Sequence, residues 1–155
     1  MSKYQPYVFV LWGDRFREAE AAIFVTRLRE AGLRVKVVGV NPYQLGGAHG
    51  LALVPDLSLD QALPLASQAV AVIIPATFSG LKQLQNDPRI SEFFRLADHH
   101  QAQFVLGAVN QAEVTALGWL PFSDDRVSFY PCCENLMMFA QELASRLLSV
   151  KFPSP

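Results

Sequence analysis

The sequence predicts an α/β domain in which a doubly wound, mostly parallel β-sheet carries helices on both faces. Apolar, β-branched runs such as 7–12 and 70–74 are typical of strands that are buried on both sides, as in a parallel sheet. Segments with helical periodicity alternate with these runs, and such alternation indicates parallel strands joined by crossover helices. Ligands in these folds bind outside the carboxyl ends of the strands, so we expect the site in loops 13–18, 75–80 and 107–111.

The first half of the chain has clear start and stop signals. The strand predicted over 7–12 ends at Gly13, and Asp14 is a candidate N-cap for a helix over 15–31. Gly32 supplies the residue that ends this helix. The next elements predicted are strands over 33–40, 51–54 and 70–74 and a short helix over 60–67.

In the second half of the chain, the strongest sign of a helix start is Asp87-Pro88. Asp at the N-cap and Pro at the first helical position favour a helix start, and this helix is expected to run to about His99. The further elements predicted are strands over 103–106 and 127–130 and helices over 111–117 and 134–149. Residues 1–150 are therefore expected to form a single domain, followed by a tail at 151–155.

The composition argues against several classes of function. The 155 residues are 51% hydrophobic and carry a net charge of −1, so we expect no nucleic-acid partner, because phosphate neutralisation needs a basic excess. No apolar run approaches the roughly 20 residues that a membrane-spanning helix needs, and no signal peptide is evident. We therefore expect a cytoplasmic protein without a membrane partner.

The histidines do not indicate a metal site. His99 and His100 are adjacent on a predicted helix, where neighbouring side chains point about 100° apart and cannot easily share a metal. His49 lies in the glycine-rich segment 46–50, which is neither a P-loop nor a dinucleotide fingerprint and is expected to serve turn geometry. We expect no metal and no cofactor.

Five segments, taken in order, resemble the ThiJ/PfpI superfamily. They are Val8 to Gly13, Glu18, Leu28 to Val40, Leu53 to Asp60 with its Pro-Asp-x-Ser-Leu pattern, and Ala71 to Pro75. The resemblance covers residues 7–118 and returns over the last helix. It implies a three-layer sandwich of the flavodoxin-like or class I glutamine amidotransferase-like type, which agrees with the fold class predicted from the residues.

The resemblance also implies a catalytic site, from which this sequence departs. Relatives carry a nucleophilic cysteine at a sharp strand-to-helix turn, a glutamate that lowers its pKa, and a Gly-Gly loop whose amides hold an oxyanion. Here Ala108 matches the position of the nucleophile, and a methyl group cannot attack a carbonyl. Ala76-Thr77 replaces the glycine pair, and of the catalytic parts only Glu18 is retained.

Two interpretations stay open for Glu18, and two for the cysteine pair Cys132-Cys133. Glu18 is either a first-turn acid that the helix dipole favours or a retained pocket carboxylate. Cys132 and Cys133 precede the last helix, and they are either ordinary buried residues or a relocated nucleophile or redox thiol. The predicted degenerate pocket consists of Glu18, Ala76, Thr77, Gly107, Ala108, Val109, Cys132 and Cys133.

Three functions follow as hypotheses. The first is a pseudoenzyme, expected to be a homodimer, that binds a small molecule or a protein partner through the degenerate pocket. The second is a thiol-dependent enzyme or redox sensor, similar to a hydrolase, glyoxalase or deglycase, that uses Cys132 or Cys133 with Glu18. The third is a structural or regulatory subunit whose apolar segment 119–122 contacts another protein.

Overall fold

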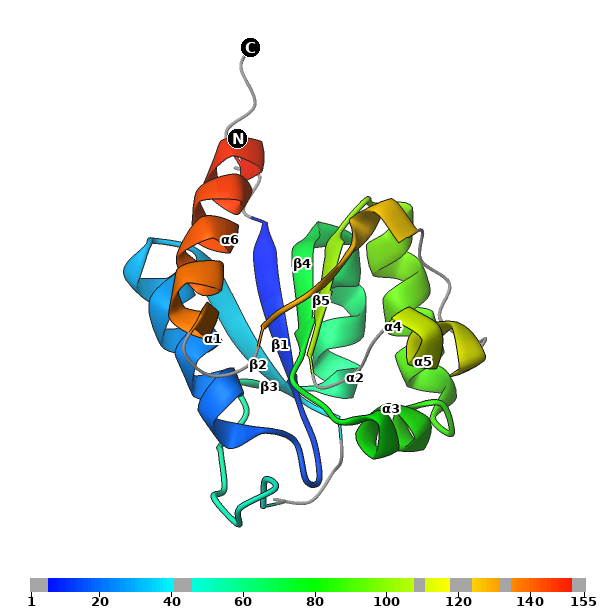
Figure 1. Ribbon diagram of the computed structural model, residues 1–155. Coiled ribbons are helices and arrows are strands. Elements are labelled where there is room, and N and C mark those ends of the chain that lie inside the picture. Colours follow the sequence, from blue (N-terminus) through cyan, green and yellow to red (C-terminus); the bar gives the residue numbers. More distant parts are fainter. Residues whose placement is uncertain (1–5, 41–45, 108–110, 118–123, 132–134, 152–155) are drawn as a thin grey trace.

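A six-stranded parallel sheet forms the centre of the molecule (Figure 1). The computed structural model describes residues 6–40, 46–107, 111–117, 124–131 and 135–151. The strands lie in the order β3-β2-β1-β4-β5-β6, which confirms the predicted fold class. Their bounds are β1 (Tyr7–Trp12), β2 (Arg34–Gly39), β3 (Leu57–Ser58), β4 (Ala69–Ile74), β5 (Gln103–Leu106) and β6 (Val127–Phe129).

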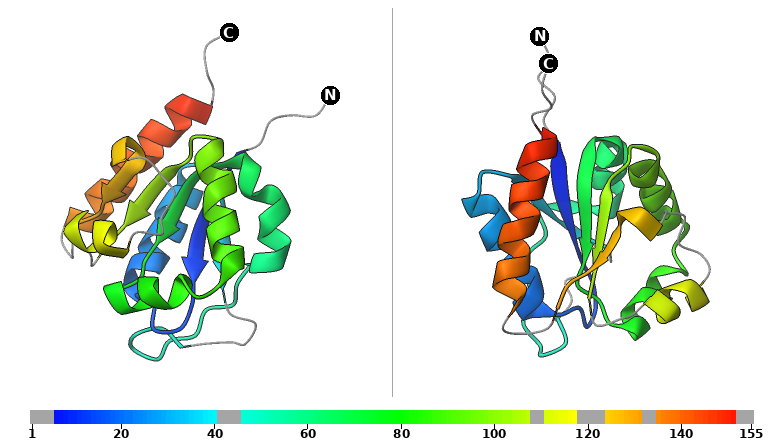
Figure 2. Two further views of the ribbon diagram at one scale, coloured as in Figure 1. Left: turned by 90° about the vertical axis from the view of Figure 1, so that its right-hand side faces the viewer. Right: turned by 45° about the horizontal axis from the view of Figure 1, so that its top comes forward.

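Helices cover both faces of the sheet and make three layers. On one face α1 (Glu18–Glu30) packs against α6 (Leu136–Lys151). On the other face lie α2 (Leu59–Ala62), the 3-10 helix η1 (Leu63–Gln68) and α4 (Pro88–His99). Figure 2 shows the same layers from two further sides. The remaining elements are α3 (Phe78–Leu84), α5 (Gln111–Leu117) and the 3-10 helix η2 (Asp124–Arg126).

The core lies on both sides of β1 and β4, whose residues are all buried, as the continuous apolar runs predict. Phe9 of β1 meets Phe93 of α4 edge to face, with ring centroids 5.4 Å apart. Burying a side chain of this size stabilises the fold by about 1.5–3 kcal/mol. No described helix is both long and apolar enough to cross a membrane.

The start of α1 differs from the prediction. Asp14 is not the N-cap; the helix begins at Glu18 after Arg17, whose side chain forms no capping hydrogen bond. The chain first makes a turn, in which Arg15 has a positive φ of 64° and the N–H of Phe16 donates to the carbonyl of Gly13. This turn delays the helix by three residues relative to the sequence pattern.

Two other predictions were wrong. Residues 51–54 form no strand: Ala52 makes only an isolated antiparallel bridge to Gly46, and the third strand is β3. The segment after β4 was predicted as a loop to residue 80, but α3 begins at Phe78 because the Thr77 side chain accepts the N–H of Gly80 and caps the helix. In contrast, the start of α4 is confirmed, since the Asp87 carboxylate accepts the N–H of Arg89 at 2.9 Å.

Candidate functional site

The loops at the carboxyl ends of β1 and β4 meet where the strand order reverses. The chain winds outward from β1 to β3 and then returns to place β4 on the other side of β1, which makes this the topological switch point. The backbone N–H of Arg17 donates to the carbonyl of Pro75 at 2.8 Å and ties the two loops together. Loops 13–18 and 75–80, which the sequence predicted to matter, are therefore neighbours.

Glu18 lies at this edge, and its carboxylate is covered by the 46–51 loop. Only 6% of the residue is exposed. Its Oε2 accepts the backbone N–H of His49 at 2.8 Å and of Leu51 at 3.0 Å. Its Oε1 lies 3.4 Å from Nδ1 of the His49 ring, whose side chain is exposed. The carboxylate thus organises a loop of its own chain.

These contacts keep Glu18 ionised. Burial raises the pKa of the carboxyl, but the backbone N–H groups of Leu51, of Glu18 itself and of His49, together with the His49 ring, lower it to about 2. At neutral pH the side chain therefore has no proton to donate to a substrate. Most of its acceptor capacity is already used by the loop.

Gly47 allows the backbone to come this close to Glu18. A Cβ at this position would lie 2.5 Å from Cδ of Glu18 and 2.7 Å from Cη2 of Trp12. The loop is further held by hydrogen bonds from the N–H of Gly47 to the carbonyl of Leu51 and from the N–H of Ala48 to that of Phe16, each at 2.8 Å. The glycine is thus required by a close approach, which the sequence pattern did not distinguish from an ordinary turn.

Trp12 has an unpaired donor in the same region. The residue is 3% exposed, and its Nε1 has no hydrogen-bond partner among the residues that the structure describes. A buried donor left unpaired costs about 1–3 kcal/mol. An acceptor brought to this edge of the sheet by a bound molecule or a water would remove that cost.

A second buried carboxylate, Glu20, was missed by the sequence analysis. It accepts the Tyr130 hydroxyl at 2.8 Å and the Nε of Arg17 at 3.2 Å. Burial, together with the hydrogen bond to Glu20, raises the pKa of Tyr130 well above its ordinary value, so the hydroxyl stays protonated and donates. Glu20 and Tyr130 are 110 residues apart, and no local pattern could have paired them.

The Tyr130 ring lies directly on the backbone of Gly107, which precedes Ala108, the residue predicted to stand at the nucleophile position. A Cβ at Gly107 would lie 1.9 Å from Cζ of Tyr130. The N–H of Tyr130 also donates to the carbonyl of Leu106 at 2.8 Å, and the ring meets Phe24 of α1 edge to face at 5.2 Å. On this side, the approach to Gly107 is filled by an aromatic side chain.

The Ala76-Thr77 pair, which the resemblance aligns with the family's glycine pair, has a structural role. Ala76 is fully buried, and Thr77 caps α3. A Cβ on Gly80 would lie 3.1 Å from Cβ of Ala76, so the first turn of α3 packs closely on this loop. The other predicted pocket residues, Ala108, Val109, Cys132 and Cys133, lie outside the described residues, as does the segment 119–122.

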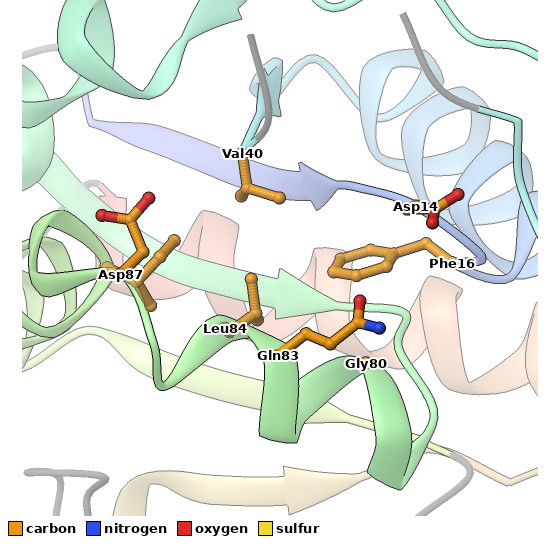
Figure 3. Close-up of a pocket in the computed structure, with 8 residues that line it drawn as sticks. Asp14, Phe16, Val40, Gly80, Gln83, Leu84 and Asp87 are labelled. Carbon is orange, nitrogen blue, oxygen red and sulfur yellow. The ribbon is translucent and has the colours of Figure 1, made fainter. Parts of the chain in front are cut away.

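A small pocket of about 60 Å³ lies beside these loops, against α3 and α4 (Figure 3). Its polar groups are Asp14, Gln83 and Asp87, and the Arg89 side chain lowers the pKa of Asp87 by bonding to its carboxylate. This volume holds a few waters but not an organic ligand. Within the described ranges no group of three or more His, Cys, Asp or Glu side chains could hold a metal ion.

Comparison with known families and solved structures identifies the family and agrees with the fold. The sequence model of the DJ-1/PfpI family matches residues 7–141. The chain belongs to the DJ-1/PfpI family. No curated protein sequence matches it significantly.

Solved structures of DJ-1 proteins share the fold of this family member. A cysteine-to-alanine mutant of the DJ-1 superfamily protein STM1931 from Salmonella typhimurium is 21% identical, with a TM-score of 0.75 over 93% of this chain and 91% of that one. Drosophila melanogaster DJ-1beta is 16% identical, with a TM-score of 0.76 over 92% and 90% of the two chains. Schizosaccharomyces pombe DJ-1 is 14% identical, with a TM-score of 0.70 over 94% of each.

Proposed function

We propose that this member of the DJ-1/PfpI family is a pseudoenzyme, which binds a small molecule or a protein partner through its degenerate pocket. The observation that carries the proposal is the state of Glu18, whose carboxylate is bound by the 46–51 loop and has a pKa of about 2. Ala108 at the position that matches the nucleophile supports the same conclusion from the sequence.

An ionised Glu18 also weighs against a relocated thiol. A glutamate lowers the pKa of a thiol only when it is protonated and donates a hydrogen bond to the thiolate, whereas an ionised carboxylate raises that pKa, because two like charges disfavour each other. A thiolate formed from Cys132 or Cys133 near Glu18 would therefore be opposed by this carboxylate. The electrostatics of the described site favour binding over nucleophilic catalysis.

Two further positions of the family's catalytic site have structural contacts here. Thr77 caps α3 where relatives offer glycine amides, and the ring of Tyr130 packs against Gly107. Nε1 of Trp12, which has no partner among the described residues, is a group at this edge that a ligand could satisfy. We therefore expect a ligand that presents a hydrogen-bond acceptor rather than one that reacts.

We further propose that the protein acts in the cytoplasm as a homodimer, without nucleic-acid or membrane partners. Leu51 and Val54, next to the loop that covers Glu18, are 57% and 81% exposed. A second copy that covers these side chains would bury apolar surface beside the pocket. Sedimentation equilibrium of the purified chain is expected to give a dimer, and a monomer at all concentrations would refute this part of the proposal.

The decisive experiment is an assay of methylglyoxal turnover by NMR, with purified protein and the Cys132→Ser/Cys133→Ser double variant as the matched control. We expect no turnover by either protein, and slow alkylation of both cysteines by iodoacetamide at pH 6. Turnover or fast alkylation that the double variant abolishes would replace the pseudoenzyme with the thiol-dependent enzyme or redox sensor. Turnover that survives in the double variant would refute both hypotheses.

A further inference from the structure

A second cavity, of about 320 Å³, lies at the amino-terminal end of the sheet. The described residues that line it are Gln103, the first residue of β5, and Leu143, Arg146, Leu147 and Ser149 from the later turns of α6. In Figure 1, α6 runs from the carboxyl end of the strands to their amino end, so this cavity lies opposite the Glu18 site. We call it the α6 groove.

The α6 groove combines an apolar floor with a polar rim. Leu143 and Leu147 are one helical turn apart on the same side of α6, and both are buried. Arg146 and Ser149 are exposed, and Gln103 is half-buried. A volume of about 320 Å³ is at the small end of the roughly 300–1,000 Å³ that ligand pockets occupy.

Arg146 differs from most described arginines because it forms no ion pair with any described carboxylate. The side-chain amide of Gln103 likewise has no hydrogen bond within the described part of the chain. Two donor groups that have no partner in the described ranges thus stand beside an apolar surface. Among the described residues, ion pairs with a carboxylate hold Arg17, Arg27, Arg29, Arg89, Arg95 and Arg126, among others.

The positive charge of Arg146 at the rim favours a negatively charged ligand. A guanidinium binds a carboxylate through two parallel hydrogen bonds, and one guanidinium balances one negative charge. Arg146 precedes the end of α6 at Lys151 by more than one turn, and the unfavourable field of a helix carboxyl end falls off within the last turn. The rim therefore suits a monoanion, and the floor suits an apolar body.

We propose that the α6 groove binds a small organic carboxylate with an apolar body. The carboxylate sits on Arg146 and accepts from the Gln103 amide, and the apolar body packs on Leu143 and Leu147. This site is independent of the pseudoenzyme proposal, since it lies at the other end of the sheet and needs no residue of the Glu18 site.

Titration of ¹⁵N-labelled protein with octanoate, followed by NMR, tests the proposal. We expect saturable shifts in the amides of Gln103 and of residues 143–149, with octanol and octylamine binding more weakly. Arg146→Gln is expected to weaken octanoate binding by about tenfold or more, because a charge-assisted pair is lost. Arg146→Lys keeps the charge but not the paired hydrogen bonds, so its octanoate affinity should lie between those of the wild type and Arg146→Gln.

Arg15→Gln is the matched control, because it removes the same charge from an exposed residue at the opposite end of the sheet. It should leave octanoate affinity within twofold of the wild type. The proposal is overturned if Arg146→Gln and Arg15→Gln behave alike, if octanol binds as tightly as octanoate, or if the shifts gather in the 46–51 loop instead. None of these outcomes would change the turnover assay, so the two proposals fail separately.

Discussion

Substitution of Gly107 by alanine provides a direct test of how tightly the Tyr130 ring packs against the chain at the end of β5. The new Cβ would lie 1.9 Å from Cζ of Tyr130 and 2.1 Å from a second ring carbon, so the ring must leave its place. When it moves, its hydroxyl leaves the Glu20 carboxylate, and its edge-to-face contact with Phe24 is lost. One methyl group thus disrupts two interactions of the Tyr130 side chain.

The size of the effect follows from these losses. Overpacking in a core costs about 1–3 kcal/mol. A buried acceptor that loses its partner costs about 1–3 kcal/mol more, although Arg17 still donates to Glu20. We expect Gly107→Ala to lower the free energy of unfolding by about 2–6 kcal/mol, the sum of these two costs and a large part of the roughly 5–15 kcal/mol that is typical of a domain.

Urea unfolding followed by circular dichroism measures the loss of free energy of unfolding. A double-mutant cycle with Tyr130→Ala shows how much of that loss comes from the clash with the Tyr130 ring. In the Tyr130→Ala background the ring is absent, and Gly107→Ala should cost less than about 1 kcal/mol. Tyr130→Phe is the control, because it removes only the hydroxyl and should cost about 1.5–3 kcal/mol. An equal cost of Gly107→Ala in both backgrounds would refute the assignment to Tyr130.

Three further predictions concern the same edge of the sheet. Because folding lowers the pKa of Glu18 from 4.5 to about 2, the ionised carboxylate stabilises the fold fully above pH 4.5, and this stabilisation is lost as the pH falls towards 2. The amide shifts of His49 and Leu51 should follow this titration, and Glu18→Gln should abolish it. Gly47→Ala, whose Cβ would meet the Glu18 side chain, should speed hydrogen exchange at those two amides while leaving exchange in β4 unchanged; protection equal to that of the wild type would contradict the close approach. Thr77→Ala removes the cap of α3 and should lower the free energy of unfolding by about 0.5–2 kcal/mol in urea titrations, whereas Thr77→Ser should cost much less.

The sequence predicted those parts of the fold that depend on nearby residues. The runs that become β1 and β4 are apolar throughout because both faces of each strand are covered. This pattern can be recognised without knowing which helices cover the strands. Asp87-Pro88 starts a helix through contacts within three residues. Such local rules do not depend on the rest of the chain.

The features that the sequence did not predict depend on contacts between distant segments. Residues 51–54 have the composition of a strand, but the 46–51 loop is held against Glu18 by hydrogen bonds across more than thirty residues, and Ala52 makes only an isolated bridge to Gly46. The pairing of Glu20 with Tyr130 spans 110 residues. The cap of α3 is local, and Thr77 followed by Gly80 is a signal that could have been recognised.

The interpretation of Glu18 shows why a retained residue is weak evidence for a retained activity. From the sequence alone, a glutamate at the position of a family carboxylate points equally to a helix start and to a catalytic pocket. The structure gives this side chain a further role, because its carboxylate fixes a glycine-rich loop through the N–H groups of His49 and Leu51. That role needs an ionised carboxylate but no thiol partner. Because this structural role does not depend on a catalytic partner, the presence of Glu18 does not by itself indicate an activity, which must be argued from a group that can react.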